Sequence, residues 1–193
     1  MANNERLEIG IILGSTRPNR VSDQVGRWVY DLARQRTDAE FELVDLRVFR
    51  LPIMDEPIPP SGAAGRYTKD HTKVWAAKID SFDGFVFVTP EYHHGIPGVL
   101  KNAIEFLYPE WVNKTAGFVS YGSAMGVRAV EQLRLVLAEL QVATVRAQVQ
   151  LSLFTDFKER TQFTPGPTKA ESVSAMLDQL VAWSRALRTI RRP

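Results

Sequence analysis

The sequence has no cysteine among its 193 residues and only three histidines, two of which are adjacent. Without thiols, the protein cannot form disulfides, zinc-thiolate sites, iron–sulfur clusters or a cysteine nucleophile. So few histidines also argue against a histidine-rich metal site, and we predict that the protein binds no metal.

Long hydrophobic runs are missing as well, because no apolar stretch reaches the roughly 18 residues that a membrane-spanning helix needs. Residues 1–6 are mostly polar and carry no signal-peptide pattern. We therefore expect a cytoplasmic protein without a membrane partner.

Neither sign of charge dominates, since 24 Lys and Arg residues face 22 Asp and Glu residues for a net charge of +2. Hydrophobic residues make up 45% of the chain and charged residues 24%, as in a typical globular protein. No basic stripe is interleaved with aromatic residues, so no nucleic-acid partner is expected. The length and composition predict a single domain over residues 1–193.

Short apolar runs alternate with segments of helical periodicity along the chain. Residues 7–13 have the unbroken hydrophobicity of a buried strand, whereas Val25, Val29 and Leu32 repeat at helical spacing. The sequence predicts strands at residues 7–13, 41–46, 85–88, 116–120 and 144–153, and helices at residues 22–36, 75–82, 97–108, 130–140 and 168–187. Such alternation indicates an α/β fold with a doubly wound five-stranded parallel sheet of order 2-1-3-4-5 and helices on both faces.

One long segment, residues 47–68, is rich in proline and glycine and has no clear period. Long connections inside a compact domain are usually lids, interface arms or disordered segments. We expect a loop here.

The predicted topology also indicates where a ligand would bind. In a doubly wound sheet, ligands lie outside the carboxyl ends of the strands, where the strand order reverses. For the order 2-1-3-4-5 that point lies between the first and third strands. The relevant loops are residues 14–22, 89–98 and 120–126.

The first of these loops combines groups that favour an anion. Gly14 allows a tight turn, and Ser15 and Thr16 supply hydroxyls. Arg17 and Arg20 supply guanidinium groups just before a predicted helix N-terminus. The spacing matches neither a P-loop nor Gly-x-Gly-x-x-Gly, which favours a phosphomonoester. The alternative is a polar turn in which an arginine pairs with a nearby carboxylate.

The second loop suits a flat polar heterocycle, because Tyr92 supplies an aromatic face and main-chain N–H groups near Gly95 can meet ring acceptors. His93 and His94 are alternatively two half-exposed loop imidazoles, and adjacent histidines rarely chelate one metal together. Glu91 is expected to be a buried carboxylate that tethers the loop rather than a catalytic base.

The third loop, residues 120–123, is expected to close over the other edge of such a ring. Alternatively, or in addition, Ser123 caps the helix that follows. Nucleophilic catalysis has little support, because there is no cysteine and no Gly-x-Ser-x-Gly elbow. The acidic positions of a response regulator are also missing after the first and third strands.

Two segments together carry a family resemblance: GSTRP at residues 14–18 and PEYHHGIPGVLKNAIE at residues 90–105. With them, the chain resembles the NAD(P)H-dependent FMN reductase family over about residues 7–187. That family has a flavodoxin-like fold and includes chromate, quinone and azo reductases. Two positions depart from its pattern, because His93 stands where Asn is usual and Asn19 stands where Gly is frequent.

The resemblance implies that the protein takes hydride from NADPH or NADH onto FMN and passes it to an electron-poor acceptor in a two-step relay. The acceptor would be a flavin, quinone, azo compound or metal oxyanion. The flavin would carry the hydride, so no residue is assigned as catalytic, although His93 and His94 are candidates for supplying a proton.

The resemblance also assigns the cofactor site. The FMN phosphate would lie on residues 15–22 and the isoalloxazine ring against residues 90–95, with residues 120–123 nearby. The implied cofactor-binding residues are Gly14, Ser15, Thr16, Arg17, Asn19, Arg20, Val21, Ser22, Pro90, Glu91, Tyr92, His93, His94, Gly95, Ser120, Tyr121, Gly122 and Ser123.

Family members are commonly homodimers or dimers of dimers, so residues 47–68 and 97–108 are candidates for a subunit interface. The alternative function is a flavodoxin-type electron carrier, or a flavin-sensing protein, without pyridine-nucleotide activity. Such carriers tend to be strongly acidic, and the net charge and Arg17 argue against one. The choice between NADPH and NADH stays open.

Overall fold

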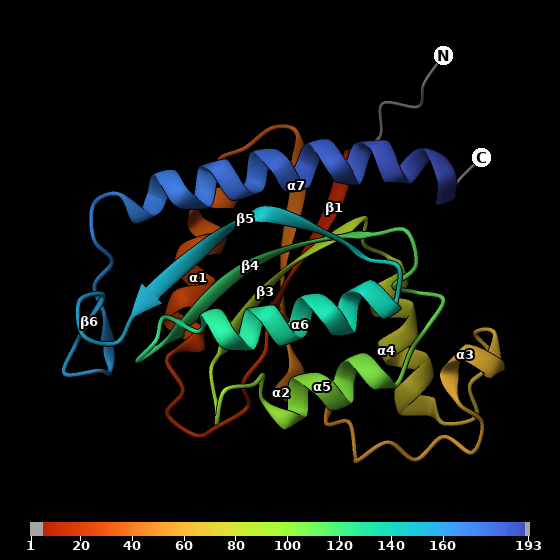
Figure 1. Ribbon diagram of the computed structural model, residues 1–193. Helices are drawn as coiled ribbons and strands as arrows, with labels where there is room; N and C mark the ends of the chain where they lie inside the picture. The colour runs from red at the N-terminus through yellow and green to blue at the C-terminus, as the bar shows by residue number, and fades with distance from the viewer. Residues whose placement is uncertain (1–5, 192–193) are drawn as a thin grey trace.

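The computed structural model describes residues 6–191 and contains a five-stranded parallel sheet with helices on both faces (Figure 1). Its strands are β1 (Leu7–Leu13), β2 (Ala39–Asp45), β3 (Gly84–Pro90), β4 (Thr115–Gly122) and β5 (Ala143–Ser152). They lie in the order β2-β1-β3-β4-β5, which confirms the predicted flavodoxin-like topology. The strand order therefore reverses between β1 and β3.

The inner strands are hydrophobic because both of their faces are covered. Every residue of β3 and β4 is buried, and Glu8 is the one exposed residue of β1. The edge strands β2 and β5 instead mix buried, partly exposed and exposed positions. In the register of the sheet, Ile11 lies beside Leu43 on β2 and beside Val86 on β3.

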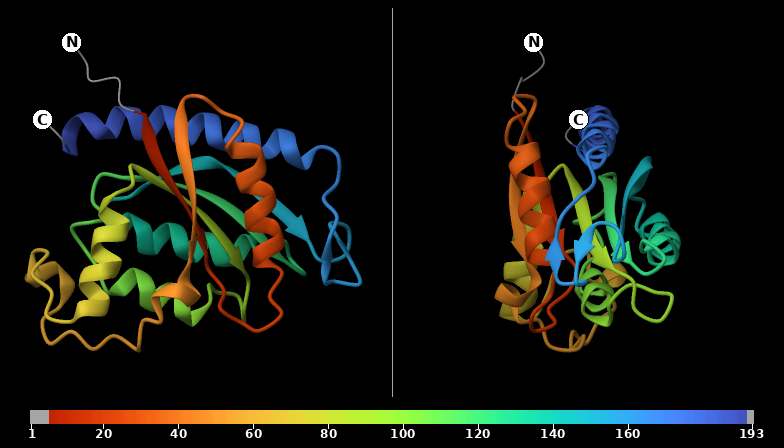
Figure 2. Two further views of the ribbon diagram at one scale, coloured as in Figure 1. Left: turned by 180° about the vertical axis from the view of Figure 1, so that it is seen from behind. Right: turned by 90° about the vertical axis from the view of Figure 1, so that its left-hand side faces the viewer.

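Two helical layers enclose the sheet (Figure 2). Helices α1 (Ser22–Ala33) and α7 (Lys169–Arg191) cover one face, and α4 (Asp70–Asp80), α5 (Gly98–Glu105) and α6 (Val127–Glu139) cover the other. Trp75 and Trp111 are buried in the second layer, where their indole N–H groups donate to Ala103 O (2.8 Å) and Ile104 O (3.2 Å). The tryptophans are thus buried without an unsatisfied donor.

The long proline-rich segment is an ordered arm rather than a structureless loop. It includes two short helices that the sequence did not predict, α2 (Leu46–Phe49) and α3 (Pro60–Ala63). The Asn102 side chain of α5 holds the arm, because it accepts from Met54 N (2.9 Å) and donates to Pro52 O (2.7 Å).

A second unpredicted feature is a small antiparallel hairpin between β5 and α7, formed by β6 (Phe157–Lys158) and β7 (Gln162–Phe163). It lies at the carboxyl end of β5 (Figure 1). Within residues 6–191, none of the helices is both long and apolar enough to cross a membrane.

Candidate functional site

The loops that follow β1, β3 and β4 meet at the carboxyl edge of the sheet, beside the point where the strand order reverses (Figure 1). Glu91 N donates to Tyr121 O (3.1 Å), which joins the second loop to the third. The hydroxyls of Ser15 and Tyr92 lie 3.2 Å apart and join the first loop to the second. The structure therefore brings the predicted loops to one place.

The loop between β1 and α1 carries hydrogen-bond donors that have no acceptor. The Ser22 hydroxyl is fully buried near the Tyr121 hydroxyl, and among residues 6–191 no partner meets hydrogen-bond geometry with it. These groups lie at the N-terminus of α1, a 12-residue helix that begins at Ser22, where backbone N–H groups and the helix dipole favour an anion. Among residues 6–191, no acceptor is found for the main-chain N–H groups of Ser15, Thr16, Asn19, Val21 and Ser22.

Two positions of this loop are constrained by the backbone. A Cβ atom on Gly14 would lie 2.9 Å from Leu100 Cδ2 and 3.1 Å from Val88 O, so the close approach of α5 requires glycine there. Asn19 has a φ of 54°, in the left-handed region that glycine and asparagine adopt most readily. Asn19 therefore preserves the turn for which glycine is frequent in the family.

The two arginines of the loop have different surroundings. The Arg20 side chain is buried and donates to both carboxylate oxygens of Asp45 (2.9 and 2.7 Å), and it also pairs with Asp23. Burial opposes its charge, yet the two carboxylates hold the pKa of Arg20 above its ordinary value. For Arg20 the carboxylate-pairing alternative holds, and its guanidinium orients the loop. Arg17 is exposed and has no carboxylate partner within the described chain.

The second loop contains a tight turn over residues 92–95. Tyr92 N donates to Gly95 O (2.9 Å), and Gly95 N donates to Tyr92 O (3.0 Å). The two central residues, His93 and His94, have φ values of 48° and 68°, which is the geometry of a type I′ turn. Asparagine and glycine favour these positions, so the asparagine usual at residue 93 has a backbone reason. Both imidazoles are exposed, as expected of loop histidines.

Glu91 tethers this turn to helix α6 rather than facing open solvent. Its side chain is 5% exposed and accepts from Arg128 N (3.1 Å) and Arg128 Nε (2.6 Å). Burial alone would raise the pKa of Glu91, but Arg128 and the α6 amides of Arg128 and Ala129 hold that pKa below its ordinary value. The tethering role that the sequence predicted for Glu91 agrees with these contacts.

Arg128 is a residue that the sequence reasoning missed. Its Nη1 donates to His94 Nε2 (2.8 Å), and Gln132, one turn further along α6, donates to His94 O (2.7 Å). Because a guanidinium only donates, His94 Nε2 is the acceptor in this contact. Helix α6 thus contacts Glu91, just before the turn, and His94, in the middle of it.

The third loop folds over Ser120, whose buried hydroxyl donates to Met125 O (2.7 Å) and accepts from Gln148 Nε2 (2.9 Å). The N-cap of α6 is Gly126, which has no side-chain cap, and the exposed Ser123 lies outside the helix. The alternative that Ser123 caps the helix is therefore wrong, because the loop continues for three residues and the Glu91 carboxylate meets the first turn instead.

The remaining predicted residues differ in exposure. Pro90 ends β3 and Tyr121 lies in β4, and both are buried. Burial raises the pKa of Tyr121 above its ordinary value of 10.0, so its hydroxyl stays protonated. Tyr92 is 38% exposed and offers part of its ring to the edge of the sheet. Within residues 6–191, no cluster of three or more histidine, aspartate or glutamate side chains has the arrangement of a metal site.

Comparison with known proteins supplies an independent view of this arrangement. Residues 7–156 match a family model described as NADPH-dependent FMN reductase. The chain is 39% identical over 157 residues to the NAD(P)H-dependent FMN reductase ntnL of Nectria sp, with 77% of this chain and 78% of that protein covered. It is 39% identical over 149 residues to the NAD(P)H-dependent FMN reductase C4B3.06c of Schizosaccharomyces pombe, with 77% and 74% covered.

Among solved structures, the chain is similar to FerB, a flavoenzyme NAD(P)H:(acceptor) oxidoreductase from Paracoccus denitrificans. The TM-score is 0.69 at 19% identity, over 93% of this chain and 98% of that one. At this identity the likeness shows the shared fold.

Proposed function

Because the chain belongs to the NADPH-dependent FMN reductase family, we propose that it passes hydride from NAD(P)H through bound FMN to a small electron-poor acceptor. It is an oxidoreductase of a family that depends on FMN and NAD(P)H. The observation that carries the proposal is the set of donors at the N-terminus of α1 that find no acceptor among residues 6–191, which lies inside the matched residues and at the switch point of the sheet.

The donors before α1 fit the phosphate of FMN. Within the described chain the buried Ser22 hydroxyl makes no hydrogen bond of normal geometry, although Tyr121 is near it, and a phosphate oxygen accepts hydrogen bonds well from hydroxyls and amides. Arg17 supplies a guanidinium that no protein carboxylate neutralises in the described residues, whereas Arg20 supports the loop through Asp45. When bound, FMN supplies the hydride chemistry itself.

The turn over residues 92–95 is proposed to orient the ring of the cofactor. The Tyr92 hydroxyl contacts Ser15 of the phosphate loop, so the two halves of the site share one hydrogen bond. The His94 ring is engaged by Arg128 at Nε2. Of the two histidines, His93 is therefore the one we propose for proton supply, because no hydrogen bond to its ring is found among residues 6–191.

The acceptor is proposed to be a flavin, quinone, azo compound or metal oxyanion. Relatives of this chain include proteins named quinone reductase and NADPH azoreductase. The exposed position of the loops at the edge of the sheet is compatible with an acceptor entering from solvent.

A homodimer or dimer of dimers is also proposed, with the arm and α5 at the interface. An apolar groove of about 550 Å³ runs between α5 and α6 and is lined by Ile104, Leu107 and Leu135, among others. Ile53 on the arm is 87% exposed and Ile58 is 50% exposed, which suits burial against a second subunit. The cytoplasmic location stays a prediction.

Replacing Arg17 by alanine is expected to weaken FMN binding roughly ten- to a hundredfold, because one charge-assisted hydrogen bond contributes roughly 1.5–3 kcal/mol. Fluorescence titration of the apoprotein with FMN measures the dissociation constant. Arg27→Ala is the matched control, since Arg27 is an exposed arginine on α1 outside the loop. An unchanged dissociation constant for the Arg17 variant would contradict the assignment of this loop to the phosphate.

Steady-state oxidation of NADPH and NADH, with a quinone as acceptor and FMN present, tests the proposed function. We expect turnover that requires both the protein and the acceptor. Flavin binding without pyridine-nucleotide oxidation would instead favour the electron carrier or the flavin sensor.

A further inference from the structure

The hairpin β6–β7 lies beyond residues 7–156, the part that matches the family model, and it is attached firmly to α1. The Gln24 side chain donates to Thr161 O (2.8 Å) and accepts from Phe163 N (2.9 Å). Gln24 lies in the first turn of α1, so these two bonds fix the hairpin close to the loop proposed to bind the FMN phosphate.

Aromatic packing supports the same position. The Phe163 ring centroid lies 5.2 Å from that of Trp28 on α1 and 5.1 Å from that of Phe157. Phe157 in turn packs against Tyr121 of β4, with ring centroids 6.1 Å apart. The hairpin is thus a rigid extension of the carboxyl edge of the sheet.

The tip of the hairpin adopts an unfavourable backbone conformation. Glu159 and Arg160 have φ values of 52° and 59°, although neither is glycine or asparagine. Such left-handed residues cost stability and persist where the surroundings hold them, which often marks a functional position. Here the conformation directs Arg160 back toward the preceding loop.

Arg160 lies over an exposed aromatic ring instead of pairing with a carboxylate. Its guanidinium carbon is 5.2 Å from the ring centroid of Phe154, and Phe154 is 62% exposed. No aspartate or glutamate lies within ion-pair distance of Arg160 among residues 6–191. The pair therefore presents a free guanidinium and an aromatic surface side by side.

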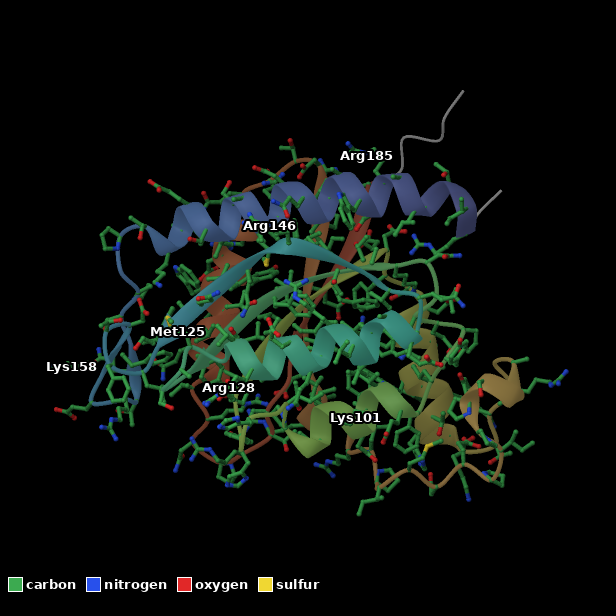
Figure 3. The ribbon with its side chains drawn as sticks, in the orientation of Figure 1. Lys101, Met125, Arg128, Arg146, Lys158 and Arg185 are labelled. Atoms are coloured by element: carbon green, nitrogen blue, oxygen red, sulfur yellow. The ribbon has the colours of Figure 1, made fainter. Side chains whose placement is uncertain are left out.

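This pair borders the candidate site. Leu153 N, next to Phe154, donates to Gly122 O (3.1 Å), and Met125 N donates to the same carbonyl (3.1 Å). Figure 3 shows Met125 and Lys158 at the same end of the molecule, where β5 terminates. Phe154 therefore directly follows a backbone position that is hydrogen-bonded to the third loop of the site.

We propose that Phe154 and Arg160 bind the adenosine 2′-phosphate end of the hydride donor, so that the protein prefers NADPH to NADH. The inference rests on the proposed function. A phosphate monoester carries between one and two negative charges near pH 7, and a guanidinium contacts it through two parallel N–H groups. The exposed surface of the Phe154 ring suits stacking of the adenine base, which both cofactors share.

Steady-state kinetics with both cofactors test this inference, using Arg160→Gln and the neighbouring Lys158→Gln as a charge-matched control. We expect Arg160→Gln to lower kcat/KM for NADPH about ten- to a hundredfold, with the value for NADH within about twofold. Lys158→Gln should change either value by less than about threefold, and Arg160→Lys should restore part of the NADPH preference because it keeps the charge.

Binding of 2′,5′-ADP, measured by calorimetry, supplies a readout without hydride transfer. We expect Arg160→Gln to weaken it by the same factor and to leave the binding of 5′-ADP and FMN unchanged. Equal losses for NADPH and NADH, or unaltered 2′,5′-ADP binding, would overturn the inference. Loss of 2′,5′-ADP binding in Arg160→Gln, in a protein that oxidises neither cofactor, would refute the proposed function and the NADPH preference, and would uphold only Arg160 as a ligand of a 2′-phosphate.

Discussion

Glu91→Gln is expected to lower the free energy of unfolding by about 2–3 kcal/mol, because hydrogen bonds to a charged group contribute roughly 1.5–3 kcal/mol. The Glu91 carboxylate accepts from the main chain and the guanidinium of Arg128, and its side chain is 5% exposed. Glutamine keeps the shape of the side chain but turns an amide NH₂ group toward these donors. The loss of stability stays within this range because the Arg128 side chain is 41% exposed, so water can replace part of its contact with the carboxylate.

The same variant is expected to bind FMN more weakly, since Arg128 connects Glu91 to His94 in the turn over residues 92–95. Urea denaturation and FMN titration measure the two effects. Glu42→Gln is the matched control, because Glu42 on β2 is half exposed and pairs with Lys78 of α4 at the surface. Its loss should stay below about 0.5 kcal/mol, and an equal loss in the two variants would contradict a tethering role for Glu91.

The sign of the pH dependence follows from the pKa of Glu91, which lies below its ordinary value of 4.5. The stabilisation is fully present above the ordinary value, where the carboxylate is ionised in both states. It is lost as the pH falls through the lower pKa of the folded state. Wild type and Glu91→Gln should accordingly converge in stability under strongly acidic conditions.

The second large effect is expected for Lys114, which is buried just before β4 at the opposite end of the sheet. Its ammonium donates to Ile79 O (2.7 Å) and Asp80 O (3.1 Å) at the end of α4. Burial lowers the pKa of Lys114 from 10.5 to about 7, and the nearby charges of Asp80 and Asp83 oppose this only in part. Between these two pH values the unfolded chain holds a proton that the folded protein has released.

Because the unfolded state binds more protons in this range, stability rises with pH. We expect the unfolding free energy of wild type, relative to Lys114→Met, to increase by about 1.4 kcal/mol per pH unit above about pH 7. Urea denaturation at pH 6, 7, 8 and 9 measures the unfolding free energy of both proteins. In their difference, the contributions of all other titrating groups cancel. Lys73→Met, at an exposed lysine of α4, should keep a constant difference in stability from wild type across this pH range. If the difference in unfolding free energy between wild type and Lys114→Met did not change with pH, Lys114 would have its ordinary pKa, and the prediction would be wrong.

The strand order and the place of the site could be predicted because they depend on local patterns. Buried strands such as β3 are unbroken hydrophobic runs, and the reversal of strand order follows from topology alone. The positive φ angles of His93 and His94 were not predicted. The asparagine that the family usually has at residue 93 could have indicated them, because asparagine adopts positive φ readily. Where a family pattern prefers asparagine or glycine, a positive φ is a reasonable prediction.

The features that were missed depend on contacts between distant segments. Arg128 is 37 positions from Glu91, and no spacing rule connects a strand end to the first turn of a later helix. Arg20 is neutralised by Asp45 at the end of β2, which only the folded sheet brings near. The hairpin escaped prediction because its strands have two residues each and its turn uses Glu159 and Arg160 instead of the Asn-Gly signal. Helix α1 ends at Ala33, three residues earlier than predicted, and Arg36 instead pairs with Asp38 and Asp178.

The most direct test of the central claim is an absorbance spectrum of the purified protein reconstituted with FMN, followed by anaerobic addition of NADPH. We predict protein-bound flavin bands at about 370 and 450 nm that bleach when NADPH is added. Bands that persist in the presence of NADPH and NADH would contradict the reductase function. If FMN does not stay with the protein at all, the assignment of the loop between β1 and α1 to its phosphate is wrong.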